Sequence, residues 1–259
     1  MKALNIIKIG GQLIDDEKAL SKFLQDFSEL KEPKILIHGG GSIASLVGER
    51  LDIPAKMIDG RRITDAETLK VVTMVYGGLV NKQLVAQLQA FDCNAIGVTG
   101  ADGNLLSADK RPVKDVDYGF AGDVKPQRVN RHLIDTLIDS GMVPVISALT
   151  HDGKGQMLNT NADTMASVFA QALADSYMVK LIYCFDKPGV LKDVVTEEIF
   201  PKLTIENTER YINKRVISTG MLPKLKNAFE AANKKVEVRL GFHQKLKMLI
   251  HGKEGTLIQ

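Results

Sequence analysis

The sequence predicts an α/β protein built on a mostly parallel, open sheet. The first 50 residues alternate between short apolar runs, which read as strands, and longer segments with apolar residues at helical spacing. Strands that alternate with helices along a chain form parallel sheets with right-handed crossovers. The chain has 259 residues, of which 44% are hydrophobic and 25% charged. This is enough for one large domain, or for two lobes that share one sheet.

The N-terminal elements set this pattern. Residues 5–9 form a short β-rich run that two glycines interrupt, and residues 16–30 place apolar side chains at helical spacing. Residues 34–38 form a second strand, after which Ser42 can cap a further helix. We therefore expect a strand–helix–strand–helix start.

The rest of the chain continues the alternation around one irregular region. Residues 103–124 mix Gly, Pro and Asp with short β runs, as expected of hairpins at the edge of a sheet. The helices expected outside this region cover 64–75, 82–91, 128–140, 163–174 and 222–232. The strands expected outside it cover 95–99, 142–148, 177–184, 236–240 and 256–258.

Composition excludes several classes of protein. A net charge of +3 from 34 basic and 31 acidic residues is nearly balanced, and no basic stripe has interleaved aromatics, so we expect no nucleic-acid partner. The N-terminal apolar run is too short for a signal peptide, and no apolar run reaches the length of about 20 residues that a membrane span needs. Cys93 and Cys184 lie far apart in apolar surroundings, which indicates two buried thiols in a reducing compartment. A cytoplasmic location is expected.

Three segments with glycine or lysine indicate that the protein handles phosphates. They are Lys8-Ile9-Gly10-Gly11, His38-Gly39-Gly40-Gly41-Ser42 and Gly220-Met221-Leu222-Pro223-Lys224, and each is expected where a strand ends. Glycines let the backbone approach an anion and direct N–H groups at it, and a following helix adds its positive N-terminal end. The chain contains neither a P-loop nor a dinucleotide fingerprint, so the phosphates must be held in another way.

Lys8 and Lys224 are the candidate cations for those phosphates. Lys8 ends an otherwise apolar strand, so we expect it to point into the cleft beyond the sheet, with a solvated lysine at a strand end as the alternative. Lys224 opens a helix, where a cation is electrostatically misplaced unless an anion lies beside it. Taken alone, Lys224 could equally be a surface lysine.

Polar residues in two other segments are candidates for binding a substrate. Arg62 precedes a helix, where its planar guanidinium could hold a carboxylate, with a solvated Arg61-Arg62 pair as the alternative. The run Asn159-Thr160-Asn161-Ala162-Asp163 leads into a helix. A helix cap at Asp163 is the simplest explanation, yet three amide or carboxylate side chains exceed what a cap needs. His38 reads as a structural side chain rather than a catalytic acid or base.

Six motifs, in order along the chain, carry a resemblance to a known family. They are Lys8-Ile9-Gly10-Gly11, HGGGS at 38–42, DGRRIT at 59–64, GFAGDV at 119–124, LNTNAD at 158–163 and GMLPKLKNA at 220–228. The chain resembles the acetylglutamate kinases of arginine biosynthesis, within the amino-acid kinase family. The resemblance implies a three-layer α/β/α sandwich around a mostly parallel open sheet. It further implies an N-terminal lobe at 1–175 for the acylated amino acid and for dimerisation, and a C-terminal lobe at 176–259 for ATP.

The resemblance also implies roles for individual residues. Lys8 and Lys224 match the lysines that neutralise the transferring phosphoryl group, and Asp163 matches the aspartate that orients them. The positions that match binding of the acylated amino acid are Gly40, Gly41, Arg62 and Asn159, with Arg62 on the α-carboxylate. The positions that match nucleotide binding are Gly10, Gly11, Asp186, Gly189, Gly220 and Met221. Mg²⁺ is expected to accompany ATP, and no residue is assigned as a metal ligand.

The implied reaction transfers the γ-phosphoryl group of ATP to the γ-carboxylate of an N-acyl-L-glutamate, giving an acyl phosphate and ADP. Because this brings two anions together, it depends on positioning and charge neutralisation rather than on a nucleophilic side chain. The alternatives are another carboxylate or carbamate kinase of the same family, and a non-catalytic sensor of nucleotide or amino acid on the same fold. The presence of both lysines and of Asp163 favours a kinase.

Three departures from the family pattern affect these expectations. Phe185 and Lys187 flank Asp186 where the family usually has a small hydroxyl residue and an apolar residue, which bears on the nucleotide contacts. Arg61 stands beside Arg62 where an apolar neighbour is usual, so a charged acyl group such as succinyl is an alternative to acetyl. Arginine-inhibited members carry an extra N-terminal helix, whereas here the first strand is expected almost at the start. We therefore expect a homodimer that arginine does not inhibit.

Overall fold

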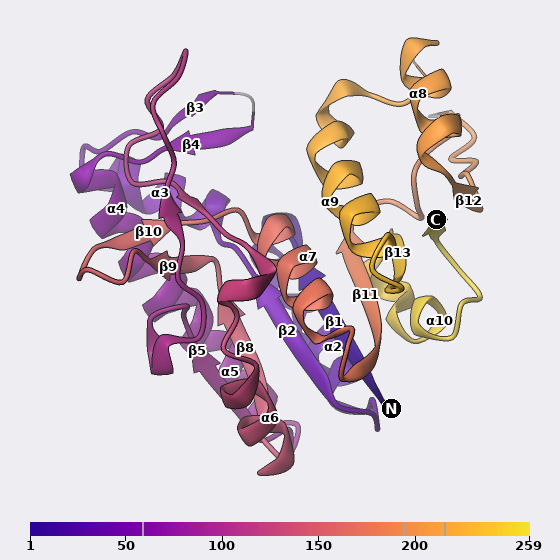
Figure 1. Ribbon diagram of the computed structural model, residues 1–259, viewed down its shortest axis with the longest axis horizontal. Coiled ribbons are helices and arrows are strands. Elements are labelled where there is room, and N and C mark those ends of the chain that lie inside the picture. The colour runs from indigo at the N-terminus through magenta and orange to yellow at the C-terminus, as the bar shows by residue number, and fades with distance from the viewer. Residues whose placement is uncertain (59, 194, 215) are drawn as a thin grey trace.

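The computed structural model describes residues 1–58, 60–193, 195–214 and 216–259, so Asp59 of the DGRRIT motif lies outside the described residues. Within these ranges, eight strands form one central sheet in the order β12-β14-β13-β11-β1-β2-β8-β5 (Figure 1). Their bounds are β1 Lys2–Ile9, β2 Lys34–His38, β5 Ala95–Val98, β8 Val143–Ser147, β11 Tyr177–Phe185, β12 Lys202–Leu203, β13 Glu237–Phe242 and β14 Thr256–Ile258.

β1 lies at the centre of the sheet, between β11 and β2, and is parallel to both. Residues 4–9 of β1 and the whole of β2 are buried. Parallel strands that are covered on both faces are nearly continuous apolar runs in sequence, which explains why both strands could be predicted. β14 runs antiparallel to β13 near one edge. The predicted α/β class with a mostly parallel sheet is confirmed.

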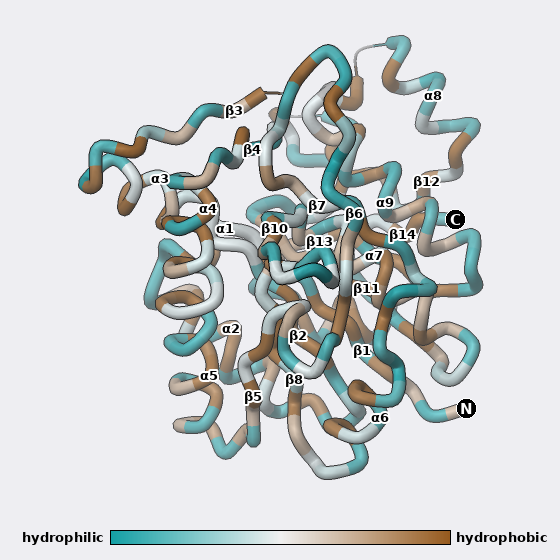
Figure 2. Tube along the Cα trace, turned by 60° about the vertical axis from the view of Figure 1, so that its left-hand side comes forward, coloured by the Kyte–Doolittle hydropathy of each residue, from teal (hydrophilic) through white to brown (hydrophobic). Residues whose placement is uncertain are grey.

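Helices cover both faces of the sheet and complete the three layers. The helices on one face are α6 Arg131–Asp139, α7 Ala162–Leu173 and α9 Leu222–Ala232, and those on the other face are α2 Glu17–Ser28, α5 Asn81–Gln89 and α10 Leu246–Ile250. The surface helices are amphipathic, and α2, for example, buries Phe23 and Phe27 on its inner side, whereas α7 is buried over most of its length. Figure 2 shows the hydrophobic residues along the central strands and on the helix turns that face them.

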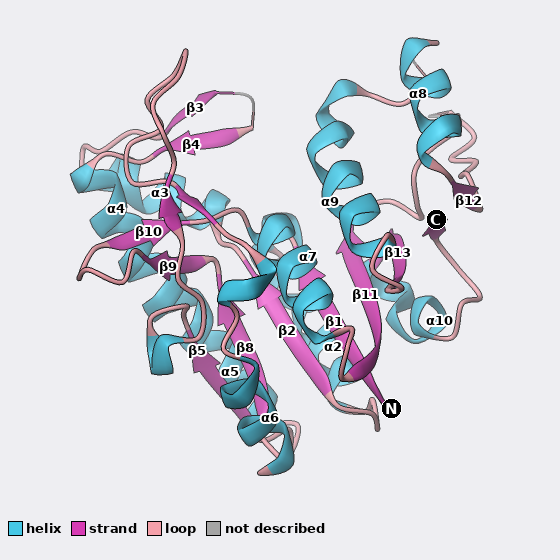
Figure 3. Ribbon diagram, in the orientation of Figure 1, coloured by secondary structure: helices cyan, strands magenta, loops and turns pink. Residues whose placement is uncertain are grey.

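Short hairpins lie beyond the carboxyl ends of the central strands. They pair β3 Lys56–Ile58 with β4 Arg61–Ile63, β6 Asp109–Lys110 with β7 Gly122–Asp123, and β9 Leu149–His151 with β10 Met157–Asn159. Figure 3 shows β3–β4 and β9–β10 among the loops beyond β2 and β8. The expectation that 103–124 forms hairpins at the edge of the main sheet is wrong in its placement. Isolated bridges join Gly119 to Thr64 and Ala121 to Asn159, so this segment crosses over the strand ends instead.

The two helices expected at 64–75 and 82–91 form one continuous helical rod. It consists of α4 Ala66–Val72, a π-helical segment η1 Thr73–Val80, and α5. The π-helical segment carries Gly77 and Gly78, yet it continues because Val75, Tyr76 and Val80 are buried against the core. Tertiary packing thus joins what local propensity separates.

Two predicted helix caps are wrong. Ser42 lies inside α3 (Gly41–Arg50), whose N-cap is Gly40 and has no side-chain cap bond. Asp163 is not the cap of α7, because the side chain of Asn161 accepts the capping hydrogen bond from the N–H of Thr164 at 3.0 Å. Since Asn161 caps the helix, Asp163 is left available for another role.

The third glycine segment does not follow a strand, contrary to expectation. Gly220 lies in a short 3₁₀ turn, η4 Thr219–Met221, after α8 (Ile205–Asn213) and directly before α9. The first and second segments do follow β1 and β2, and a short helix α1 (Gly11–Asp15) follows the first. Among the described residues, no helix combines the length and the apolar character needed to cross a bilayer.

Candidate active site

Two lysines and one aspartate form an ion-paired cluster at the carboxyl edge of the sheet. Lys8 lies near the end of β1, and Asp163 and Lys224 lie in the first turns of α7 and α9. Lys8 Nζ is 2.7 Å from Asp163 Oδ1, and Lys224 Nζ is 3.2 Å from Asp163 Oδ2. The exposed fraction of the side chain is 10% for Lys8 and 18% for Lys224, so neither is a solvated surface lysine. The fold thus brings together three residues from distant parts of the sequence.

The electrostatics of this cluster favour an incoming anion. Burial alone would raise the pKa of the Asp163 carboxyl, but the charges and hydrogen bonds of Lys8 and Lys224 outweigh burial and hold this pKa at about 2. Burial, and then the positive charge of Lys8, lower the pKa of Lys224. Two ammonium groups that share one carboxylate leave an excess of positive charge in a site largely screened from water. Phosphate oxygens would relieve that excess.

Aromatic side chains of β11 support Lys224. Its Nζ lies 5.7 Å from the ring centroid of Tyr183 and 5.7 Å from that of Phe185, at cation–π range. The hydroxyl of Tyr183 also donates a hydrogen bond to the backbone carbonyl of Asp163 at 3.0 Å. Phe185, which departs from the family pattern, therefore contacts one of the two lysines of the cluster.

A cavity of about 220 Å³ opens on the β2 side of the cluster, and we refer to it as the acceptor cavity. It lies beyond the carboxyl ends of β1, β2 and β8, where ligands bind in open α/β sheets. Its lining includes all four residues predicted to bind the acylated amino acid, namely Gly40, Gly41, Arg62 and Asn159. It also includes Lys8, Arg61, Tyr76 and Arg111.

Arg62 is held rigidly in the acceptor cavity. It is 9% exposed, and its Nη2 donates to the carbonyl of Gly41 at 2.7 Å and to Ser45 Oγ at 2.9 Å. Asn159 is fixed in a similar way, because its Nδ2 donates to Thr64 Oγ1 at 3.0 Å. Held side chains lose little entropy when a ligand binds, so this cavity is pre-organised.

Gly40 lies against the ring of Tyr76 in the wall of this cavity, where only glycine fits without a shift. Its φ is +153°, and a Cβ there would lie 3.0 Å from a ring carbon of Tyr76. A side chain at position 40 would therefore meet the ring and displace it. With glycine in place, the uncapped N-terminus of α3 can present its N–H groups to an anion.

A second cavity, of about 470 Å³, opens on the β11 side of the cluster, and we refer to it as the donor cavity. Its lining includes the predicted nucleotide positions Gly10, Gly11, Asp186 and Met221. It also includes Lys8, Lys224, Phe185, Asp16 and His243. Gly189 and Gly220 are not among the residues that line it; a Cβ on Gly189 would meet Thr256 Oγ1 at 2.6 Å, so this glycine permits close packing.

The two cavities share one wall. Lys8, Gly10 and Gly11, at the end of the central strand β1, line both. A group bound in the donor cavity and a group bound in the acceptor cavity would therefore meet at Lys8. This arrangement suits the transfer of a charged group between two ligands, and Lys8 and Lys224 would neutralise the charge in transit.

His38 supports the second glycine loop rather than the chemistry. It is fully buried, and its Nδ1 lies 2.7 Å from the carbonyl of Gly39 while its Nε2 lies 3.0 Å from Asn81 Nδ2. The carbonyl requires a donor and the amide NH₂ is a donor, so the ring is neutral with its proton on Nδ1. Burial lowers the pKa of His38 to about 4, which agrees with a neutral ring.

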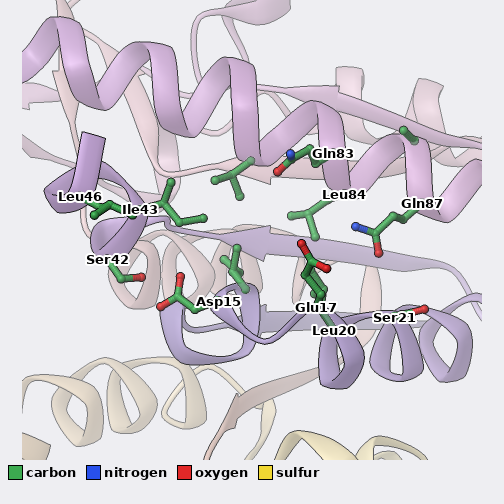
Figure 4. A pocket seen from close by; sticks show the side chains of 13 residues that line it. Asp15, Glu17, Leu20, Ser21, Ser42, Ile43, Leu46, Gln83, Leu84 and Gln87 are labelled. Atoms are coloured by element: carbon green, nitrogen blue, oxygen red, sulfur yellow. The ribbon is translucent and has the colours of Figure 1, made fainter. Parts of the chain in front are cut away.

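A cavity of about 840 Å³, larger than either the acceptor cavity or the donor cavity, lies elsewhere (Figure 4). It lies between α1, α2, α3 and α5, and Asp15, Glu17, Gln83 and Gln87 contribute its polar lining. Its lining contains neither lysine nor arginine, so it is unsuited to hold phosphates. The smaller cavities beside Lys8 are the better candidates.

The described residues contain no group of three or more His, Cys, Asp or Glu side chains that could hold a metal ion. Asp186 and Asp16 do contribute carboxylates to the donor cavity. One or two carboxylates are the usual protein share of a metal ion that binds mainly to nucleotide phosphates. The donor cavity therefore fits a metal–nucleotide complex better than a free metal ion.

Several residues of the site were not predicted. Tyr76 and Arg111 line the acceptor cavity, and Asp16 and His243 line the donor cavity. Tyr76 lies in a helix and Arg111 in an irregular segment, and neither position shows a local pattern of function. Their roles depend on tertiary placement, which sequence spacing does not report.

Comparisons with known proteins agree with this geometry. A model of the amino acid kinase family matches residues 3–241. A protein named acetylglutamate kinase from Bacteroides fragilis is 54% identical over 231 residues, covering 89% of this chain and 88% of the relative. Another of that name, from Cytophaga hutchinsonii, is 52% identical and covers 90% of this chain and 88% of the relative. The solved structure of smu.665 from Streptococcus mutans has a TM-score of 0.79 at 28% identity, and covers 100% of this chain and 99% of its own.

Proposed function

The chain belongs to the amino acid kinase family, and from this premise we propose that it is an acetylglutamate kinase of arginine biosynthesis. It would transfer the γ-phosphoryl group of ATP to the γ-carboxylate of N-acetyl-L-glutamate. The observation that carries the proposal is the pair of cavities that meet at Lys8, Gly10 and Gly11, with Lys8 and Lys224 on one carboxylate. The shared name of the relatives, at 54% and 52% identity over most of the chain, supports the choice of substrate.

In the proposed mechanism, the acceptor carboxylate attacks the γ-phosphorus in line. A bond forms between a carboxylate oxygen and phosphorus, the bond from phosphorus to the β,γ-bridging oxygen breaks, and ADP leaves with the electron pair. The carboxylate is already ionised at neutral pH, so no general base is needed. Lys8 and Lys224 stabilise the charge on the phosphoryl oxygens. Asp163, with a pKa of about 2, remains ionised throughout and acts by orienting the two lysines.

The acceptor would be oriented by the residues that the acceptor cavity holds rigid. We propose that Arg62 binds the α-carboxylate, and that Gly40, Gly41 and Asn159 complete the contacts to the amino acid. The N-acyl group has a chemical purpose, because a free amine would let the γ-acyl phosphate cyclise on itself. The residues that line this cavity all fall within 1–175, which we propose as the N-terminal lobe.

For the nucleotide, we propose contacts from Gly10, Gly11, Asp186 and Met221, which line the donor cavity, whereas the predicted positions Gly189 and Gly220 lie outside that lining. The donor cavity is lined by the β1–α2 segment together with residues from 176–259, which we propose as the C-terminal lobe for ATP. An ATP-dependent kinase uses a divalent metal, and we propose Mg²⁺. It would be held mainly by the phosphate oxygens, with Asp186 or Asp16 nearby, and it would offset phosphate charge.

We also propose that the protein is a cytoplasmic homodimer. Both cysteines are buried and free, which is compatible with a reducing compartment. Large apolar side chains are exposed on α3 and η1, at Leu46, Met74 and Leu79, and these would be covered in a dimer. Light scattering should then give twice the chain mass of 28.4 kDa. A mass of one chain would contradict the dimer and leave the chemistry untouched.

The direct test of the activity is ADP release from Mg-ATP, with hydroxylamine present to trap an acyl phosphate. N-acetyl-L-glutamate should give hydroxamate, and free L-glutamate should give far less. ATP binding without hydroxamate from any acylated glutamate would instead favour a sensor. The intact Lys8–Asp163–Lys224 cluster argues against that alternative.

A further inference from the structure

The acceptor cavity carries more positive charge than N-acetyl-L-glutamate needs. Its lining contains Lys8, Arg61, Arg62 and Arg111, and among the residues that the structure describes it includes neither aspartate nor glutamate. N-acetyl-L-glutamate has two carboxylates. In the proposed mechanism, Arg62 binds one of them and the other approaches Lys8. Arg61 and Arg111 are therefore unassigned by the reaction.

Arg111 is already balanced by a neighbour. Its Nε donates to Asp123 Oδ1 at 3.1 Å, its Nη2 also pairs with that carboxylate, and its guanidinium lies 5.3 Å from the ring centroid of Tyr118. Arg61 differs, because no ion pair or side-chain hydrogen bond joins it to any other residue that the structure describes. It is half-buried, on β4 of the hairpin over the cavity. Asp123 is close enough for its charge to act on Arg61, but this carboxylate is paired with Arg111, so two guanidinium groups share one carboxylate. The excess positive charge in this half-buried site is costly unless an anion offsets it.

The neighbours of Arg61 differ from those of Lys8 and Arg62. Burial lowers the pKa of Arg61 and the charge of Arg111 lowers it further, while the charge of Asp123 opposes both without reversing the direction. Lys8 instead pairs with Asp163, and Arg62 with Gly41 and Ser45. The cavity thus offers three separate cationic positions to one ligand.

We infer that Arg61, supported by Arg111, forms a subsite for an acyl group that ends in its own carboxylate. The acceptor class then extends to N-acyl-L-glutamates whose acyl group is a dicarboxylic acid, with N-succinyl-L-glutamate as the compound to test. Three carboxylates would meet three cationic positions. This inference rests on the proposed kinase activity and concerns only which acyl group the cavity selects. The reaction at the γ-carboxylate is the same for either acyl group.

The test compares N-succinyl-L-glutamate with N-butyryl-L-glutamate, which has the same chain length without the terminal carboxylate. The full chain is assayed with Mg-ATP and hydroxylamine, and kcat/KM is measured for both compounds and for N-acetyl-L-glutamate. The succinyl compound should exceed the butyryl compound by about 10- to 100-fold, the range for one hydrogen bond to a charged group. In Arg61→Leu this ratio should fall to near one, and Arg61→Lys should keep part of it.

Lys56→Met is the matched control, because Lys56 is an exposed cation on the same hairpin that does not line the cavity. It should leave the succinyl-to-butyryl ratio unchanged. Thermal unfolding gives a second readout that does not need turnover. The succinyl compound should raise the melting temperature more than the butyryl compound, and Arg61→Leu should remove the difference.

Several results would overturn the inference. Equal kcat/KM for the succinyl and butyryl compounds would do so, as would an Arg61→Leu variant that slows all three substrates alike. Turnover of the acetyl compound alone would reject the subsite and leave the kinase in place. No hydroxamate from any of the three would reject the kinase itself, and the inference with it.

Discussion

Asp163 is the residue on which the site depends, because it holds two lysines that would otherwise repel each other. It pairs with Lys8 Nζ at 2.7 Å and with Lys224 Nζ at 3.2 Å. Because Asn161 caps α7, the Asp163 carboxylate in the first turn of that helix is not needed for capping and can pair with the two lysines. A permanently ionised orienting group suits a reaction that moves charge without moving a proton.

Removing either lysine should slow the transfer step. Lys224→Met should lower kcat by about 100- to 1000-fold, the usual loss when one group that stabilises transition-state charge is removed. Lys226→Met on the same helix, where the side chain is exposed, is the control and should stay near wild type. Steady-state kinetics with N-acetyl-L-glutamate checks both. A loss seen only in the KM for ATP would contradict a role for Lys224 in the transition state.

Asp163 should also make stability depend on acid pH. Its pKa is about 2 in the folded protein and 3.8 in the reference state, so its contribution is fully present above pH 4 and is lost as pH falls toward 2. The shift corresponds to about 2 kcal/mol. Urea unfolding at several pH values should show the stability gap between wild type and Asp163→Asn narrowing by about that amount between pH 4 and 2. A gap that does not change with pH would contradict the ion-paired state.

At the scale of elements, the long strands were predictable and the short hairpins were not. β1 and β2 are mainly apolar runs that glycines follow directly, so their sequences alone indicate buried strands. The strands of the β3–β4 hairpin have three residues each, which is too short for an alternation of apolar and polar residues to be recognised. This hairpin contributes residues to the lining of the acceptor cavity. The expected break between α4 and α5 is absent because buried contacts in η1 outweigh its two glycines.

The turn from β2 into α3 gives a prediction at this scale. Gly40→Ala should raise the KM for N-acetyl-L-glutamate more than the KM for ATP, because the added Cβ would press on Tyr76 in the acceptor cavity. It should also cost about 1–3 kcal/mol of stability from backbone strain and overpacking. Gly153→Ala is the control, since Gly153 also has a positive φ but nothing within 4 Å of a Cβ. An equal rise of both KM values would contradict the assignment of the two cavities.

At the scale of the molecule, the central position of β1 explains the site. In the sheet, β2 and β8 lie on one side of β1, and β11 and β13 lie on its other side. The carboxyl end of β1 therefore borders both the acceptor cavity and the donor cavity. The cluster of Lys8, Asp163 and Lys224 was predicted because its motifs are local in sequence. Arg111 and Tyr76 were missed because only the folded chain brings them to the cavity. The same applies to Arg61. Its sequence context marks it as an extra positive charge, but only the folded chain shows that no ion pair or side-chain hydrogen bond joins it to the other residues that the structure describes.

The central claim is that one phosphoryl group passes between the two cavities across Lys8. The most direct measurement is the stoichiometry of hydroxamate and ADP formed from Mg-ATP and N-acetyl-L-glutamate with hydroxylamine present, in wild type and in Lys8→Met. Equal amounts of both products in wild type, and neither above background in the variant, is the result we predict. ADP without hydroxamate, or unchanged hydroxamate in the variant, would contradict it.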